Sequence, residues 1–167
     1  MTTQPDDPQS VLTRYAAGPA QLEAAVAGLG ERDLDVAPAG GGWSIRQIAH
    51  HIVDGDDIWK AGIKAALGNG EGEFILRWYW DVPQAAWAER WNYAGRDLAP
   101  SLALFRANRY HILQLLRHIP DAWTRSIHLT WPDGEQVQIT VGEIVAMQAR
   151  HALGHVNDIL ALRNARL

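Results

Sequence analysis

The sequence predicts an all-α protein, a four-helix bundle with a small β-hairpin between the third and fourth helices. Four long segments repeat apolar side chains at the three- and four-residue spacing of one helix face. A short strand-like stretch, Ile127 to Ile139, lies between the last two of these segments. The chain has 167 residues without repeats or a long linker, so we expect a single domain over residues 1–167.

The first two helices have recognisable breaks and caps. Apolar spacing predicts the first helix over residues 9–29, and the Gly18-Pro19 pair is expected to kink or restart it. Ser44 is a favourable N-cap for the second helix because Gln47 follows at the capping-box position. The glycine-rich residues 68–70 are expected to end this helix.

The second half of the chain carries similar signals. The third helix is expected over residues 98–119, with Pro120 as its stop. Two short strands are expected around the turn at 132–134. Thr140 is expected to cap the last helix, over residues 141–162, because a glutamate follows at the capping-box position.

Composition excludes several functional classes. The chain contains no cysteine and seven histidines, so thiolate metal sites, disulfides and cysteine nucleophiles are impossible, and a transition-metal site would need His, Asp or Glu ligands. Its formal net charge is -4 and its 15 basic residues are scattered, which argues against a nucleic-acid partner. No apolar run suits a membrane span and no secretory signal is visible, so we expect a cytoplasmic protein.

The last helix interrupts its apolar stripe with Gln148, His151 and His155. The two histidines are four residues apart, which places them on one helix face about 6 Å apart along the axis, where both can bind one metal ion. The alternative is a pair of core histidines that form hydrogen bonds to carbonyl groups or to an acid such as Glu23 or Asp54. The spacing alone favours neither reading.

The second helix offers a third ligand in the pair His50-His51. Adjacent helical residues diverge by about 100°, so only one of the two can face the bundle interior. His51 lies at the edge of the apolar stripe, whereas His50 is expected at the surface near Asp54 or Asp57. Asp54 can either orient a ligand histidine through the second ring nitrogen or pair with His50.

Four motifs in the order expected of one family span most of the chain: GGWSIRQIAHHIVD at 41–54, RYHILQLL at 109–116, PDGE at 132–135 and H-x-x-x-H at 151–155. With these motifs the chain resembles the DinB/YfiT-like superfamily of metal-dependent four-helix-bundle proteins. The resemblance implies that His51, His151 and His155 bind a divalent metal, the same three histidines that the stripe geometry favours. It also implies a homodimer.

Three imidazole ligands leave an open metal position, where the ion would acidify a bound water or thiol. The resemblance accordingly implies either a metal-dependent hydrolase or a transferase of bacillithiol or a related small thiol, acting on a small-molecule substrate. Zinc or nickel is the expected metal, although copper and iron also suit such a site. The alternative from another class is a helical bundle that binds a metal or ligand without turnover.

Candidate catalytic residues are Asp54, Arg109 and Gln148. Gln148 lies one turn before His151 and can touch a bound water or substrate. Arg109 occupies an apolar stripe, where it can bind an anionic group of the substrate or, as we slightly favour, serve the structure. Asp54 is a candidate general base, together with Asp57 and Asp158, because each lies about one turn from a proposed ligand.

The last unusual feature is residues 73–93, which hold half of the fourteen aromatic residues. This segment can wall a substrate pocket, form a dimer contact or pack across one end of the bundle as ordinary core. Around the ligands, Met147, Gln148 and Ala152 replace the aromatic and histidine residues of the YfiT branch, so that branch's substrate is not carried over. The remaining histidines, His111, His118 and His128, are expected to be structural or exposed.

Overall fold

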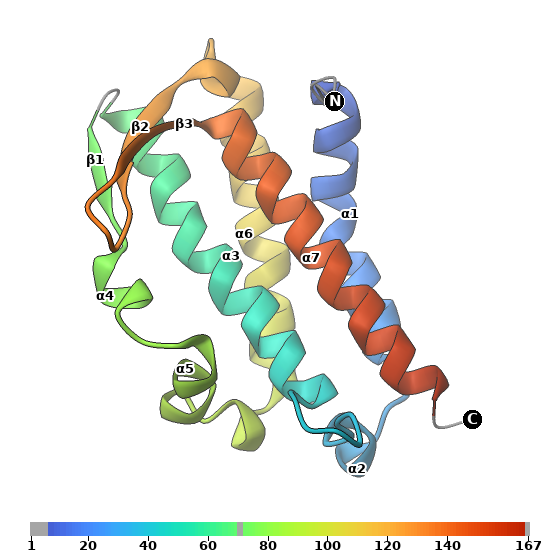
Figure 1. The fold of residues 1–167 in the computed structure, drawn as a ribbon. Helices are drawn as coiled ribbons and strands as arrows, with labels where there is room; N and C mark the ends of the chain where they lie inside the picture. The colour runs from blue at the N-terminus through green and yellow to red at the C-terminus, as the bar shows by residue number, and fades with distance from the viewer. Residues whose placement is uncertain (1–6, 70–71, 166–167) are drawn as a thin grey trace, which may run out of the picture.

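Four long helices form the body of the protein in the computed structural model, which describes residues 7–69 and 72–165. Helices α1 and α3 both pack against α6 and against α7, so the order around the bundle is α1, α7, α3, α6 (Figure 1). This arrangement confirms the predicted four-helix bundle. The bounds are α1 Pro8–Val26, α3 Ile45–Gly68, α6 Leu98–His118 and α7 Val141–Asn164.

Both predicted capping boxes are present. Ser44 caps α3 and exchanges hydrogen bonds with Gln47, and Thr140 caps α7 in the same way with Glu143. These caps satisfy backbone N–H groups that have no partner in the first turn of a helix.

Of the two outcomes expected at Gly18-Pro19, a kink or a restart, the restart is wrong, because α1 continues through Pro19. A proline inside a helix lacks the N–H that would bond to the carbonyl four residues earlier, here that of Tyr15. The side chain of Arg109 replaces this donor, with its Nη1 2.9 Å from the Tyr15 oxygen. The helix ends at Val26, earlier than expected, and the short helix α2 (Glu31–Leu34) follows.

The predicted hairpin is present and a third strand extends it. Strands β2 (Ser126–Thr130) and β3 (Gln136–Thr140) are antiparallel, and β1 (Glu73–Ile75) pairs with β2 in parallel, giving the order β1-β2-β3. Pattern reasoning missed β1 because three residues are too few to show an alternation. The remaining elements are α4 Arg77–Trp80, α5 Gln84–Arg90 and the 3₁₀ turns η1 Tyr93–Gly95 and η2 Ala122–Thr124.

The buried apolar side chains form two clusters, one toward each end of the bundle. One contains Trp59 of α3 and the buried apolar residues of α7 between Val141 and Ala149 and continues under the sheet. The other contains the buried apolar residues of α3 between Ile45 and Val53 and of α7 between Ala152 and Ile159. The change from one cluster to the other falls near Asp56 and His151, where polar side chains enter the interior. None of the helices in the described part of the chain combines the length and apolar character needed to cross a lipid bilayer.

Candidate metal centre

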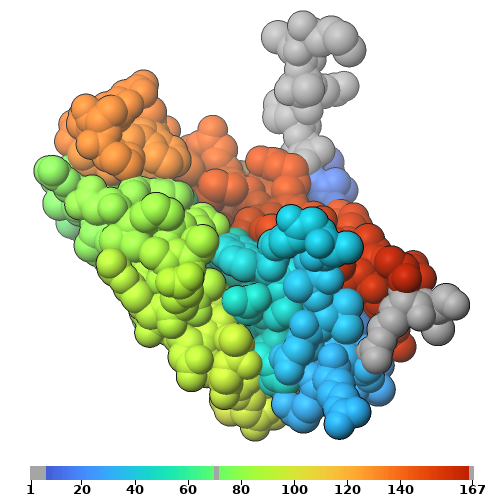
Figure 2. Space-filling view, turned by 60° about the horizontal axis from the view of Figure 1, so that its bottom comes forward, coloured from blue at the N-terminus to red at the C-terminus, as the bar shows by residue number. Residues whose placement is uncertain are grey.

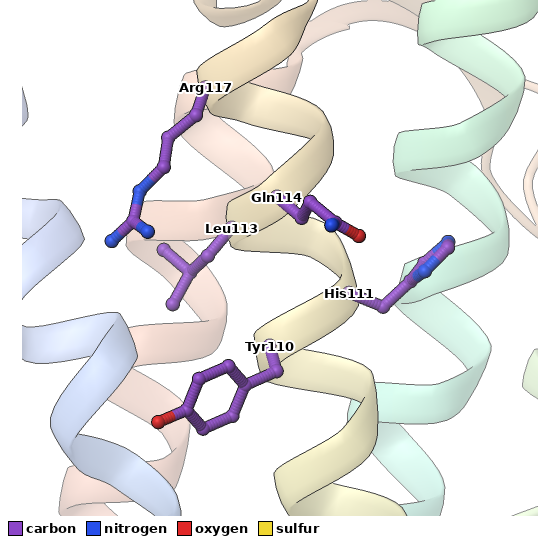
Figure 3. Close-up of a pocket in the computed structure, with 5 residues that line it drawn as sticks. All are labelled: Tyr110, His111, Leu113, Gln114 and Arg117. Atoms are coloured by element: carbon purple, nitrogen blue, oxygen red, sulfur yellow. The ribbon is translucent and has the colours of Figure 1, made fainter.

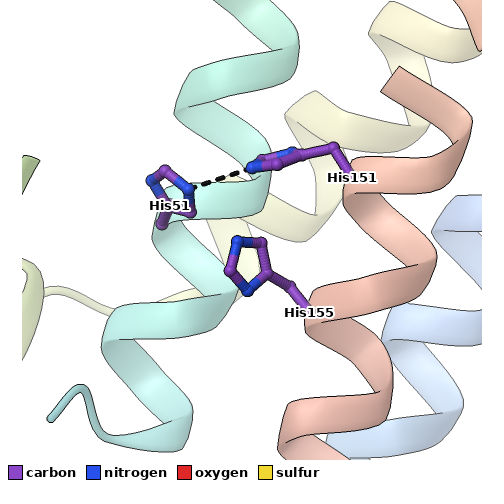
Figure 4. Close-up of side chains that lie close together, drawn as sticks. All are labelled: His51, His151 and His155. Atoms are coloured by element: carbon purple, nitrogen blue, oxygen red, sulfur yellow. Dashed lines mark hydrogen bonds between the residues drawn. The ribbon is translucent and has the colours of Figure 1, made fainter. Parts of the chain in front are cut away.

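Three histidines converge between α3 and α7 (Figure 4). His51 comes from α3, and His151 and His155 come from successive turns of α7. Each offers one ring nitrogen, and these nitrogens all lie within 4.8 Å of one another. The Nε2 atoms of His51 and His151 are 3.0 Å apart. The structure therefore brings together the three residues that sequence analysis selected.

The spacing and charge of this cluster fit a divalent metal. Metal–nitrogen bonds of about 2.0–2.1 Å place two ligand nitrogens of a tetrahedral site about 3.3 Å apart. The observed distance of 3.0 Å between Nε2 of His51 and Nε2 of His151 is close to this value. Burial, followed by the neighbouring imidazoles, lowers the pKa of His51 to about 3. Burial also lowers the pKa of His151 to about 4, with smaller contributions from His155 and Arg109. Both rings are therefore neutral at pH 7, the form in which imidazole binds metals.

Asp158 orients one of the three rings. Its Oδ2 atom lies 2.9 Å from Nδ1 of His155, which leaves Nε2 of that ring free to face the cluster. A carboxylate on the second nitrogen of a ligand histidine is the usual outer partner in metal sites, because it fixes the tautomer and the ring orientation. The helical spacing predicts only a general-base role for Asp158, since it does not show which nitrogen of His155 the carboxylate contacts.

His50, the neighbour of His51 in the sequence, was expected at the surface. This expectation is wrong, because His50 is fully buried. Its Nδ1 is 2.9 Å from the Ser101 hydroxyl and its Nε2 is 3.3 Å from the Arg96 carbonyl oxygen, while the Tyr93 ring stacks on it at 5.6 Å. The expectation failed because the segment leading into α6 folds over this face of α3, which the helix pattern cannot show.

The α3 carboxylates Asp54 and Asp57, expected near His50, bind other side chains. Asp54 accepts a hydrogen bond of 3.0 Å from Arg96, rather than pairing with His50 as one reading of the sequence had it. Asp57 pairs with Lys60 and accepts a hydrogen bond from Asn108.

Arg109 lies in the core and is only 1% exposed. Its Nε donates to Asp56 at 2.7 Å and its Nη2 donates to the Gln148 carbonyl at 3.1 Å, in addition to the Tyr15 contact. Burial raises the pKa of Asp56 to about 6, although Arg109 opposes the shift. Arg109 thereby fixes the backbone of α7 one turn before His151.

A cavity of about 160 Å³ adjoins the histidines. His51 and His151 line it on one side, and aromatic side chains of the 73–93 segment, Tyr79 and Trp80, line it together with Trp131. Figure 2 shows this segment, in green, lying along α3 opposite the red helix α7. Among the three roles considered for the segment, the structure supports a pocket wall for Tyr79 and Trp80. The clustering of aromatic residues was the signal that could find this wall.

A second hollow lies along α6, where Tyr110, His111 and Arg117 are among the lining side chains (Figure 3). His111 is exposed there, as is His118, whose Nδ1 contacts the Gln114 carbonyl of its own helix. His128 lies half-buried in β2. These histidines are therefore placed as sequence analysis expected, as structural or exposed residues.

Comparison with known proteins gives a consistent match over most of the chain. Residues 14–159 match the sequence profile described as the DinB superfamily. A protein of Geobacillus thermodenitrificans named "Putative metal-dependent hydrolase" is 25% identical over 148 residues, which cover 89% of this chain and 79% of that protein. YfiT of Bacillus subtilis carries the same description and is 28% identical over 145 residues, covering 86% and 77% respectively.

The solved structure of Bacillus subtilis YfiT has the same fold. It aligns with a TM-score of 0.82 at 23% sequence identity, covering 99% of this chain and 90% of that one. It is described as a four-helix bundle of unusual topology.

Proposed function

The chain belongs to the DinB superfamily, and from this premise we propose that it is a divalent-metal-dependent hydrolase of a small-molecule substrate, with His51, His151 and His155 as ligands. The observation that carries the proposal is the convergence of three imidazoles, two of which line a cavity. The relatives named as metal-dependent hydrolases support the reaction class.

A divalent ion held by three histidines supplies Lewis-acid chemistry and lowers the pKa of a water molecule at its open position. The chain's own residues supply the orientation. Asp158 holds the ring of His155, and Arg109 holds the backbone of Gln148, a residue that lines the cavity. Tyr79 and Trp80 exclude bulk water from one side of the reacting group. We assign Asp54, through its ion pair with Arg96, a positioning role at the adjoining segment.

Zinc or nickel is the metal we propose, since imidazole ligands suit both. Metal analysis of the purified protein beside the His51, His151, His155→Ala triple variant tests the ligand set. We expect close to one equivalent in the wild type and background metal in the variant. Equal metal content in the two samples would contradict the assignment.

The reaction is tested next with the metal-loaded protein. One panel contains amide and ester substrates, and the other contains small thiols together with an electrophile. We expect turnover of the first panel that is lost in the triple variant. Turnover of the second panel alone would identify a thiol transferase, and binding without turnover of either would identify a non-catalytic bundle.

A further inference from the structure

Gly55 lies buried in the middle of α3, at a position where the fold does not require a glycine. Apart from the adjacent stretch of α3 backbone, a Cβ atom here would have one neighbour within 4 Å among the described residues, Cε1 of His151. The distance would be 3.5 Å, an ordinary van der Waals contact. Glycine nevertheless destabilises the interior of a helix relative to alanine. Packing therefore does not explain why this residue is a glycine.

Another glycine of α3 shows what a packing requirement looks like. A Cβ atom at Gly62 would lie 3.1 Å from Cε1 of Phe74 in β1, closer than side chains normally pack. Gly62 thus makes room for the strand. Gly55 instead lines the cavity beside the histidine cluster, together with His51 and His151.

The missing side chain at Gly55 leaves space next to the proposed metal ligands. Gly55 lies one turn after His51, and Trp59 follows one turn later, so the three residues share one face of α3. The cavity that they line has a volume of about 160 Å³, close to the roughly 150 Å³ of an apolar cavity that accommodates benzene. Its other walls are mostly apolar or aromatic and include Ile58, Tyr79, Trp80, Trp131 and Met147.

We propose that Gly55 is a specificity-determining residue, which keeps this cavity open for an apolar group of the substrate up to about the size of a benzene ring. The inference deepens the proposed function, on which it rests, because it places the apolar part of the substrate beside the ligands His51 and His151 and the reacting group at the metal. A methyl group at position 55 would occupy part of this space and leave the helix intact.

Gly55→Ala tests the inference with two readouts that should move in opposite directions. The midpoint of urea denaturation of the metal-free protein should rise, because alanine favours the helix. Benzene, titrated in excess EDTA and followed by NMR, should bind saturably to the wild type. It should bind roughly 5- to 100-fold more weakly to the variant, because the added methyl group overpacks the filled cavity. A lower midpoint, equal benzene affinity in the two proteins or no saturable binding to the wild type would overturn the proposal.

Gly154→Ala is the matched control. Gly154 lies within α7 and is exposed, and a Cβ atom there would have no neighbour within 4 Å among the described residues. This variant should raise the denaturation midpoint in the same way and leave benzene binding unchanged. It therefore separates the effect of helix propensity from that of filling the cavity. Equal loss of benzene affinity in the two variants would contradict the role assigned to Gly55.

Two hydroxamates extend the test to the zinc-loaded protein. Benzohydroxamate and acetohydroxamate share a group that chelates zinc, and they differ in carrying a phenyl ring or a methyl group. In the wild type, benzohydroxamate should bind more tightly by roughly tenfold or more, because its ring is buried in the cavity. Gly55→Ala should reduce this ratio. An unchanged ratio would contradict the proposal.

The two proposals fail in distinguishable ways. Benzene binding that Gly55→Ala weakens, in a protein that takes up no metal, would remove the hydrolase and leave a cavity whose size Gly55 sets. Metal uptake and hydrolysis by a protein that binds no benzene would remove this inference and leave the hydrolase. Weaker metal binding by Gly55→Ala at unchanged benzene affinity would assign the glycine to the placement of the His151 ring, and would also overturn the inference.

Discussion

Helix α3 carries two adjacent buried histidines with opposite surroundings. His50 has both ring nitrogens engaged, by the Ser101 hydroxyl and the Arg96 carbonyl. Next to it, His51 points its Nε2 at Nε2 of His151, so that two like groups face each other. The first arrangement completes the hydrogen bonding of the interior. The second directs ring nitrogens of His51, His151 and His155 toward one point, where a metal ion can bind all three.

Burial does not distinguish the histidine of the cluster from its neighbour. His50 and His51 are 0% and 4% exposed, respectively. The difference lies in the partners, and partners follow from the opposing helix. Helix α7 places imidazoles opposite His51, whereas α6 and the segment before it place a hydroxyl and a carbonyl opposite His50.

The largest expected effect separates the two residues by metal affinity. His51→Ala removes one of three ligands and should lower the affinity by more than the roughly 100-fold that the loss of an outer partner causes. His50→Ala should leave the affinity unchanged, because His50 contacts no member of the cluster through its ring nitrogens. Competition with a chromophoric chelator measures both constants. Similar losses in the two variants would refute the distinction.

A second prediction concerns another buried group of α3, Asp56, whose Oδ1 accepts a hydrogen bond from Arg109. Arg109→Met leaves this carboxylate buried without its counter-ion and should lower the free energy of unfolding by about 3–5 kcal/mol. The control is Arg106→Met on the same helix, because Arg106 forms an exposed ion pair with Glu23 and should cost less than about 1 kcal/mol. Urea denaturation of the metal-free proteins gives both values.

Adding Asp56→Leu to Arg109→Met tests the cause. If the uncompensated carboxylate dominates, the double variant should recover much of the loss, but not all of it, because the Tyr15 carbonyl, which Pro19 cannot serve, still lacks a donor. A double variant less stable than Arg109→Met would show that the carboxylate is not the main cost.

Sequence reasoning succeeded where a local pattern determines the outcome. Apolar spacing and the Ser44 and Thr140 caps located the long helices, because helix periodicity and capping depend on residues a few positions apart. The histidine cluster was predictable for the same reason. The i, i+4 spacing placed His151 and His155 on one face, and the direction of the apolar stripe selected His51.

The failures share a different cause, which is contact between segments distant in the sequence. Pro19 does not interrupt α1 because Arg109, ninety residues later in the chain, donates to the carbonyl that the proline leaves free. His50 is buried because residues 93–96 cover it. Strand β1 exists because β2 pairs with it. Spacing within one segment contains no information on such partners.

A third prediction compares His50 and His51 by the free energy of unfolding instead of metal affinity. In the metal-free protein, His50→Ala should lower the free energy of unfolding by about 2–3 kcal/mol, because it leaves a cavity and the Ser101 hydroxyl and Arg96 carbonyl without their partner. His51→Ala should cost less, since it removes a ring that lacks a full set of partners. His111→Ala, at an exposed position, should change stability by less than about 0.5 kcal/mol. A larger loss for His51→Ala than for His50→Ala would contradict the assignment of roles.

The smallest expected effect concerns the outer partner of the cluster. Asp158→Asn keeps the shape of the side chain but replaces a charged acceptor of the His155 Nδ1 proton, so metal affinity should fall roughly 10- to 100-fold. Asp54→Asn is the matched control, because Asp54 bonds to Arg96 and should leave the affinity unchanged.

This last pair of variants asks whether a carboxylate acts through a ligand ring or only through general negative charge near the metal. Both substitutions remove one negative charge from the chain, so a purely long-range effect would lower the affinity in both. A loss confined to Asp158→Asn means that the hydrogen bond to His155 itself raises the basicity of the ligand and fixes its ring. That outcome extends the contrast between His50 and His51 to a third histidine, whose outer nitrogen is engaged while its inner nitrogen stays free for the metal.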